Sequence, residues 1–271
     1  MPAVAAKGAE LTDLSDAYAN MAYIPDGAAY PARWAAAAAA FRARSSWRRE
    51  AYGPGARQQI DIFTPKAVPK GLVVFVHGGY WLQFSPEDWS HLAAGPLAAG
   101  WAVALPGYDL APAVRLSEIT LQVALAVQVA ARHIGGPLRL CGHSAGGHLV
   151  ARMLCPGVLP ADLLARVAQV VPISPLADLA PLLRTAMNAD LRLDAGEARA
   201  ESPLHCPPPA QKVHVWVGAE ERPAFLGQAR SLALAWGAAL SEEPGRHHFN
   251  VVEGLAQPGS ALLQALLGRE G

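Results

Sequence analysis

The chain has 271 residues, and its 22 Lys+Arg balance its 22 Asp+Glu, so the formal net charge is zero. A balanced chain without a basic stripe argues against nucleic acid or an anionic membrane surface as the main partner. Hydrophobic residues make up 52% of the chain and charged residues 16%, which excludes disorder for most of its length. We expect a small-molecule substrate as the partner. The oligomeric state stays open, and a homo-oligomer is one option.

The first 55 residues differ in composition from the rest, since they are rich in Ala, Tyr and Arg. Alone they bury too little apolar surface to fold. We therefore predict that residues 1–55 form an N-terminal helical extension of one or two helices packed on the main domain. One hypothesis is that this extension covers the substrate pocket of the domain formed by residues 56–271.

After residue 56, apolar β-rich runs alternate with helical patterns, which predicts βαβ units and a mostly parallel sheet of the α/β class. Runs such as LVVFV and VHVWV are almost continuously apolar, as is typical of strands covered on both faces. The predicted strands are 58–63, 72–76, 102–105, 138–141, 167–173, 213–217 and a short one near Leu240. The predicted helices are 87–99, 116–134, 146–153 and 223–236.

The most apolar stretch, residues 92–105, is too short for a membrane span of about 20 residues and is interrupted by glycine and proline. The N-terminus lacks the basic start and apolar run of a secretory signal. Cys141, Cys155 and Cys206 are odd in number and show no CxxC spacing, which argues against a disulfide framework and against a cysteine zinc site. These features predict a soluble protein of a reducing compartment, the cytoplasm.

The strongest chemical signal is GHSAGG at residues 142–147, directly after a predicted strand and before a helical run. Such a strand–turn–helix is what a nucleophile elbow requires, because the strained turn lifts the hydroxyl of Ser144 above the end of the strand. The new helix would point its N-terminal N–H groups at the site where negative charge develops. The alternative is an idle serine in a glycine-rich turn.

The second signal is HGGYW at residues 77–81, after the strand LVVFV. In α/β hydrolases an HGG motif at this position supplies oxyanion-hole N–H groups, and glycine lets the backbone approach the reacting oxygen. We predict oxyanion donors at Gly79 and Ala145, with Gly78 or Tyr80 contributing. His77 is interpreted as a bracing side chain. Tyr80 and Trp81 are candidates for lining the substrate pocket, with ordinary packing as the alternative.

A reactive serine needs a histidine that takes its proton. In this fold the acid and the histidine follow the serine along the chain. Among the histidines after Ser144, the pair His247 and His248 stands in a loop before the last helical stretch. We favour His248, because Phe249 next to it could anchor the loop.

The acid that orients the histidine should lie at the carboxyl end of a strand. After VHVWV come Glu220 and Glu221, and either could serve. Asp178, beyond the strand VVPIS, is the reserve candidate.

With HGGYW, GHSAGGHL and HHFNVVEGL in hand, the chain resembles the kynurenine formamidase (arylformamidase) branch of the α/β-hydrolase superfamily, from about Tyr52 to the C-terminus. The stretches QQIDIFTP, GWAVALPGYDLAP and VWVGAEERPAF also fall where that family has a leading strand, a third strand and the acid-bearing strand end. The resemblance implies the α/β-hydrolase fold, with Ser144 as nucleophile, His248 as base and Glu221 as acid. At the position of Glu221 the animal enzymes carry aspartate.

The resemblance further implies hydrolysis of N-formylkynurenine to kynurenine and formate through an acyl-serine, without a metal or organic cofactor. Tyr80 or Trp81 would then stack on the flat aromatic leaving group. Two other hypotheses remain: a broad carboxylesterase that acts on small acyl esters with the same machinery, and a binding or scaffold protein that keeps the fold without catalysis.

Overall fold

The computed structural model of the chain describes residues 12–268. Within this range eight strands form one sheet in the order β1-β2-β4-β3-β5-β6-β7-β8. From β4 along the sheet to β8 every neighbouring pair is parallel, whereas β2 runs antiparallel to both β1 and β4. The strands are β1 (Trp47–Ala51), β2 (Gln59–Phe63), β3 (Leu72–Val76), β4 (Ala102–Pro106), β5 (Leu138–His143), β6 (Val167–Ile173), β7 (His214–Gly218) and β8 (Ala239–Glu243).

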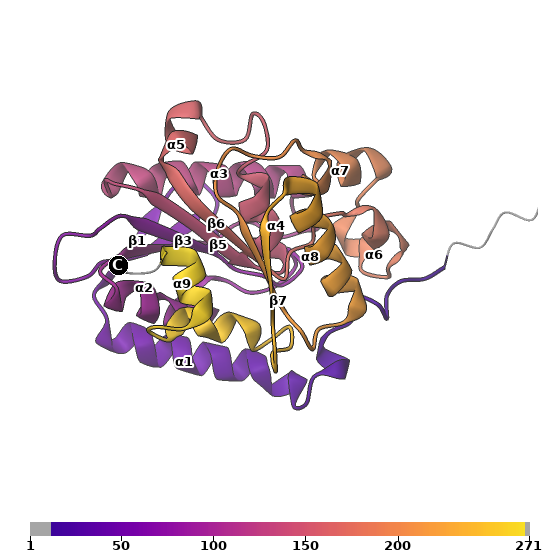
Figure 1. Cartoon of the computed structure of the whole chain (residues 1–271), viewed down its shortest axis with the longest axis horizontal. Helices are drawn as coiled ribbons and strands as arrows, with labels where there is room; N and C mark the ends of the chain where they lie inside the picture. The colour runs from indigo at the N-terminus through magenta and orange to yellow at the C-terminus, as the bar shows by residue number, and fades with distance from the viewer. Residues whose placement is uncertain (1–11, 269–271) are drawn as a thin grey trace, which may run out of the picture.

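Helices follow most of the strands and cover both faces of the sheet (Figure 1). The α-helices are α1 (Tyr30–Arg44), α2 (Ala94–Ala98), α3 (Leu116–His133), α4 (Ala145–Arg152), α5 (Ala161–Arg166), α6 (Asn188–Leu191), α7 (Ala195–Ala200), α8 (Pro223–Trp236) and α9 (Ala261–Leu267). Shorter 3-10 helices are η1 (Met21–Tyr23), η2 (Gly27–Ala29), η3 (Pro86–Asp88), η4 (Ser90–Ala93), η5 (Ala180–Arg184), η6 (Pro203–His205) and η7 (Val251–Ala256). No helix in residues 12–268 is both long enough and apolar enough to cross a bilayer.

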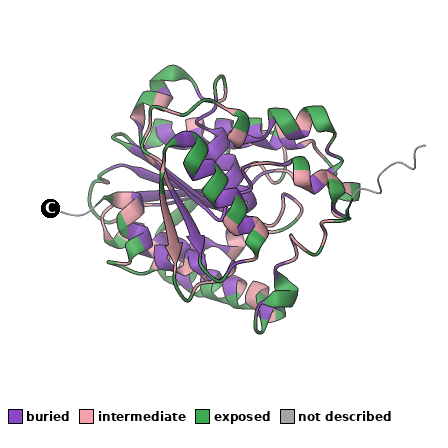
Figure 2. Ribbon diagram, turned by 45° about the vertical axis from the view of Figure 1, so that its right-hand side comes forward, coloured by how far each residue is buried: buried purple, intermediate pink, exposed green. Residues whose placement is uncertain are grey.

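Successive side chains of the central strands point to opposite faces of the sheet and form part of two apolar layers, one on each face. Val73 and Phe75 of β3 pack with residues of α1 and α9, whereas Leu72, Val74 and Val76 pack with residues of α3, α4 and α8. Figure 2 shows the central strands buried between helices whose outer surfaces are exposed. Because both faces of the central strands are covered, these strands need apolar residues at nearly every position, which explains their continuous apolar runs.

The predicted strands after residue 56 are all present within one or two residues, and the predicted helices at 116–134, 146–153 and 223–236 correspond to α3, α4 and α8. The α/β-hydrolase fold is confirmed. The prediction of one helix over 87–99 is wrong, because this stretch forms η3, η4 and the short α2. Pro96 lacks the backbone N–H that a continuous helix would use there.

Residues 1–11 of the predicted N-terminal extension lie outside the described residues, and its described part, residues 12–55, is not only helical. Its α1 buries Trp34, Ala38 and Phe41 against the sheet domain, and β1 then joins the sheet as an edge strand beside β2. The sheet therefore crosses the predicted boundary at residues 55 and 56. The sequence WRREA of β1 gave no apolar alternation, since four of its five residues are exposed at the edge.

An ion-pair cluster fastens this segment to the sheet. Asp61 of β2 is fully buried, and its carboxylate accepts hydrogen bonds from Arg42 of α1 at 2.6 Å and from Arg49 of β1 at 2.7 Å. The guanidinium of Arg42 also lies 3.9 Å from the ring centroid of Trp47. A buried carboxylate requires such partners, so the cluster fixes where α1 crosses the sheet.

The prediction against a disulfide is wrong for one pair. Cys155, after α4, and Cys206, after η6, form a disulfide bond with their Cα atoms 5.7 Å apart, whereas Cys141 is free and buried. The two partners are 51 residues apart and meet through the packing of α4 against η6, which no local spacing reveals. The inference of a reducing compartment loses its support from the cysteines.

We predict that the fold loses stability in mild acid. His77, His143 and His148 are buried, and desolvation lowers the pKa of His77 and His148 to about 4 and that of His143 well below its ordinary value. Below the unfolded-state pKa of about 6.5, these histidines bind protons in the unfolded chain but stay neutral in the folded chain. As the pH falls, each of the three histidines should therefore lower the free energy of unfolding by up to about 1.4 kcal/mol per pH unit, until the pH reaches its folded pKa.

Urea titrations at pH 7.5, 6.0 and 5.0 would measure this loss of stability. We expect the urea concentration at the unfolding midpoint to fall between pH 6.0 and pH 5.0. The Nε2 of His148 lies within hydrogen-bond distance, 2.7 Å, of the carbonyl oxygen of Glu201, and replacing His148 by glutamine should weaken the pH dependence of the midpoint. A midpoint that stays constant down to pH 5 would contradict the prediction.

Candidate active site

The serine stands on a strained turn between β5 and α4. Ser144 has φ 57° and ψ −115°, a conformation that a residue other than glycine adopts only when its surroundings impose it. Its N–H donates to the carbonyl of Ile173 at 2.8 Å. A Cβ on Gly146 would lie 1.9 Å from the carbonyl oxygen of Val76, so only glycine lets α4 start this close to β3. The turn is a nucleophile elbow in geometry as well as in sequence.

The histidine and the acid meet across the end of β7. Nδ1 of His248 lies 2.6 Å from Oε2 of Glu221, and both side chains are buried. The other oxygen of Glu221, Oε1, accepts hydrogen bonds from the hydroxyl of Ser174 and from the N–H of Gly218. One oxygen of the carboxylate is therefore held by these donors, and the other is available to the histidine. Because the acid pairs with Nδ1, Nε2 of His248 is left to accept a hydrogen bond from a hydroxyl.

Two further groups contact His248, one at its ring and one at its backbone. Phe225 packs against it with ring centroids 4.2 Å apart. His143, the residue before the serine, places its Nε2 2.8 Å from the carbonyl oxygen of His248. His248 and Ser144 line the same pocket.

The competing candidates lie elsewhere. Glu220 is exposed, whereas Asp178 accepts from the N–H of Ala180 and is held through its backbone by Gln228. His247 is half-buried, and its Nε2 lies 3.2 Å from the hydroxyl of Tyr30 in α1. Of the pairs that the sequence left open, the structure brings together Glu221 and His248.

The HGG segment passes next to the serine. A Cβ on Gly78 would lie 2.8 Å from the carbonyl oxygen of His143 and 3.1 Å from the Cβ of Ser144, and Gly79 has φ 101°. Ala145 is the first residue of α4, so its N–H belongs to the unpaired N-terminal turn of that helix. These positions suit backbone donors to an oxyanion.

His77 has the bracing position expected of it. Its ring stacks on Tyr108 with centroids 4.3 Å apart, and the hydroxyl of Tyr108 donates to its carbonyl at 2.9 Å. Burial lowers the pKa of His77 to about 4, so the ring is neutral near pH 7.

A pocket of about 410 Å³ opens over Ser144, and we call it the Ser144 pocket. Its walls are largely aromatic and apolar. They are formed by Ser15, Tyr18, Ala19, Asn20, Met21, Pro31, Trp34, Gly79, Tyr80, Leu82, Gln83, Phe84, Trp89, His143, Ser144, Thr185, Ala186, Met187, His248 and Phe249.

Of the two aromatic residues proposed to line the pocket, Tyr80 does and Trp81 does not. The side chain of Trp81 is fully buried and packs edge-on against His148 of α4, with ring centroids 5.1 Å apart. The prediction for Trp81 is wrong, because positive φ angles at both residues turn the chain so that this ring enters the core.

Residues from before the sheet domain complete the pocket. We call residues 13–24 the strap. Its Leu14 N–H donates to the carbonyl of Arg184, and Tyr18 accepts from the hydroxyl of Tyr80 at 2.6 Å through its carbonyl. Arg222, next to the triad candidate Glu221, holds Asp16 with an ion pair of 2.6 Å. The described part of the N-terminal segment thus lies over the pocket.

Several residues that line the pocket were not predicted from the sequence. Trp34 of α1 packs against Trp89 in a tilted arrangement, with ring centroids 4.5 Å apart, and contacts Phe84 and Phe249. These rings come from distant segments, so no local motif joins them. Ser174 could have been found, since it directly follows β6 at the edge where the carboxyl ends of parallel strands meet.

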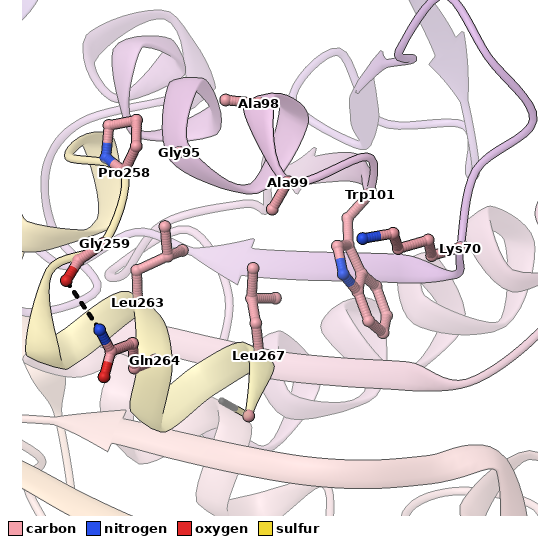
Figure 3. Close-up of a pocket in the computed structure, with 11 residues that line it drawn as sticks. Lys70, Gly95, Ala98, Ala99, Trp101, Pro258, Gly259, Leu263, Gln264 and Leu267 are labelled. Carbon is pink, nitrogen blue, oxygen red and sulfur yellow. Dashed lines mark hydrogen bonds between the residues drawn. The ribbon is translucent and has the colours of Figure 1, made fainter. Parts of the chain in front are cut away.

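A second cavity, of about 620 Å³, lies between α2 and α9 at the opposite edge of the sheet, where Lys70 and Trp101 precede β3 and β4 (Figure 3). Its walls are mostly apolar, and Gln264 bonds the carbonyl of Gly259 within them. Its lining holds no serine, histidine or acid, so the larger cavity is not where the hydrolytic chemistry lies. Among residues 12–268, no cluster of histidine, cysteine and acidic side chains could hold a metal ion.

Comparison with known proteins agrees with this geometry. The alpha/beta hydrolase family model matches residues 73–267. Kynurenine formamidases of Salmo salar and Danio rerio are each 30% identical to this chain, over 234 and 236 residues, covering 80% of this chain and 79% of theirs.

Solved structures show the same fold. A candidate thioesterase from Silicibacter sp. TM1040 is 55% identical, with a TM-score of 0.91, over 93% of this chain and 98% of that one. An arylesterase structure, at 20% identity, has a TM-score of 0.66 over 82% of this chain and 84% of that one, and it supports the fold alone. The chain belongs to the α/β-hydrolase family, in the kynurenine formamidase-like branch, and is an enzyme with formamidase or esterase activity.

Proposed function

We propose that the protein hydrolyses an aryl formamide, N-formylkynurenine, to kynurenine and formate, with Ser144, His248 and Glu221 as its catalytic triad. The observation that carries the proposal is the 2.6 Å contact between His248 and Glu221, together with the position of His248 in the lining of the same aromatic pocket as Ser144. The choice of substrate rests on the similarity of this chain to kynurenine formamidases. The pocket volume is within the range of about 300–1000 Å³ typical of small-molecule sites.

In the first half-reaction, Oγ of Ser144 attacks the formyl carbon while Nε2 of His248 takes the hydroxyl proton. The negative charge moves to the former carbonyl oxygen, to which the N–H groups of Gly79 and Ala145, with Gly78 beside them, donate in this mechanism. Removing one such donor typically costs about 2.7–4 kcal/mol of barrier lowering. The carbon–nitrogen bond then breaks, and the aryl amine leaves with the proton from His248.

In the second half-reaction, a water molecule attacks the formyl ester on Ser144 and gives a proton to His248. The ester bond breaks, the proton on His248 returns to Oγ, and formic acid leaves and releases its own proton to solvent as formate. Glu221 stays ionised throughout and stabilises the imidazolium that forms twice in the cycle.

The competing activity is hydrolysis of small esters or thioesters. It is favoured by the 55% identity to a candidate thioesterase, since the same triad and oxyanion donors would cleave either bond. The aromatic walls of the Ser144 pocket argue for a flat leaving group, because Trp34 and Tyr80 can stack on one.

A substrate panel tests the proposal. The purified protein is assayed with N-formylkynurenine, p-nitrophenyl acetate and acetyl-coenzyme A, and kcat/KM is compared. We expect N-formylkynurenine to exceed the other two by at least about tenfold, since an amide needs the aryl leaving group held in place to be cleaved. Turnover of N-formylkynurenine no faster than in buffer, with rapid cleavage of the ester or the thioester, would overturn it.

A further inference from the structure

Asn20 contributes a side chain with an unpaired oxygen to the lining of the Ser144 pocket. This strap residue lines the pocket and is only 7% exposed. Within residues 12–268, its side-chain oxygen Oδ1 is buried and has no hydrogen-bond partner. Burying an unpaired acceptor is costly, so such a group indicates a partner that the protein chain does not itself provide.

The same pocket gathers other groups of this kind. Nε1 of Trp89 and Nδ1 of His143 are also buried without a partner, and both residues line the Ser144 pocket. Of nine such atoms in the described part of the chain, three therefore belong to residues of one pocket. This concentration indicates polar atoms that a bound molecule satisfies.

The strap holds Asn20 in a fixed place. Tyr18, two residues before it, is fastened at both ends: its carbonyl accepts from Tyr80, and its hydroxyl accepts from Gln228 at 2.9 Å. The carbonyl of Asn20 accepts from the N–H of Tyr23 at 3.0 Å. The carboxamide is thus presented by a segment anchored to the sheet domain, as a recognition group requires.

The size of the acyl group decides which part of a substrate meets Asn20. A formyl group is a single carbon bound to Ser144, so the rest of the substrate, its leaving half, occupies the pocket. In N-formylkynurenine the donors of this half are the amide N–H at the reacting bond and the ammonium of the amino-acid side chain. The unpaired acceptor of Asn20 comes from the strap and not from the catalytic triad or the oxyanion donors, so we match it with the ammonium.

We propose that Oδ1 of Asn20 accepts a hydrogen bond from this ammonium, which makes the enzyme selective for aryl formamides that carry an amine donor on the leaving half. This inference rests on the proposed function. A hydrogen bond to a charged group is among the stronger ones, and a site built for it rejects an analogue that lacks the donor.

The test compares N-formylkynurenine with the analogue in which hydrogen replaces the α-amino group. The wild-type protein should prefer the amine-bearing substrate by at least about tenfold in kcat/KM. Asn20→Leu, of similar volume, should reduce this preference to less than about threefold, whereas Asn20→Asp, which keeps an acceptor, should retain or increase it. Asp16→Asn is the matched control: it loosens the strap by weakening the ion pair with Arg222, and because Asp16 does not line the pocket it should affect both substrates alike.

An unchanged preference in Asn20→Leu, or an equal loss with both substrates, would overturn the inference. So would a wild-type protein that hydrolyses both substrates at the same rate, which leaves the proposed function standing. If Asn20→Leu fails to fold, the wild-type ratio and the Asn20→Asp ratio still decide. Failure of the wild-type protein to cleave either formamide would overturn the proposed function and this inference together.

Discussion

Replacing Ser144 or His248 by alanine is expected to lower kcat for formamide hydrolysis by roughly 10⁴- to 10⁶-fold while leaving the fold intact. Without the hydroxyl there is no acyl-enzyme, and without the imidazole the hydroxyl keeps its proton and the aryl amine leaves without one. Because the two residues act in one step, the double variant should lose little more than either single variant. The measurement is kcat for release of kynurenine, with circular dichroism to check folding.

His247→Ala is the matched control for the histidine. His247 is the neighbour of His248, but it contacts Tyr30 of α1 and not the acid. Its loss should therefore change kcat by less than about tenfold, through a small shift of the loop. If His247→Ala abolishes turnover and His248→Ala does not, the base has been misassigned.

Much of the fold could be predicted because it depends on local patterns. The apolar runs of β3 and β6 and the periodic apolar residues of α3 each carry their own signal, and parallel strands require covering on both faces. Strand β1 carried no such signal, because it lies at the sheet edge and is held by the pairing of Arg49 with Asp61 rather than by apolar burial.

The candidate site divides in the same way. The elbow at Ser144 and the HGG segment are local devices, since their strained or close backbone demands particular residues at fixed spacing. The walls of the pocket are not local: Trp34, Phe84 and Phe249 meet only after folding. For the same reason Trp81 looked like a pocket residue from its neighbours in sequence, whereas the turn at residues 80 and 81 sends its ring into the core.

Glu221→Gln should lower kcat by roughly 10³- to 10⁴-fold, although glutamine has nearly the same shape. The reason lies in the second oxygen of Glu221, which accepts from both Ser174 and Gly218. These two donors will hold the single oxygen of the glutamine, so its NH₂ group must face Nδ1 of His248. The imidazole then has to accept at Nδ1 and carry its proton on Nε2, the tautomer that cannot take the proton of Ser144.

This effect is separated from a general loss of charge by two controls. Glu220→Gln removes an exposed carboxylate from the adjacent position, and Asp178→Asn alters a side chain whose contact is the N–H of Ala180. Both should keep kcat within about threefold of the wild-type value. Ser174→Ala adds a sharper check: in the Ser174→Ala/Glu221→Gln protein one of the two donors is gone, so the glutamine can turn its oxygen toward Nδ1 more easily and part of the activity should return. A larger loss in Asp178→Asn than in Glu221→Gln would show that the triad acid is Asp178.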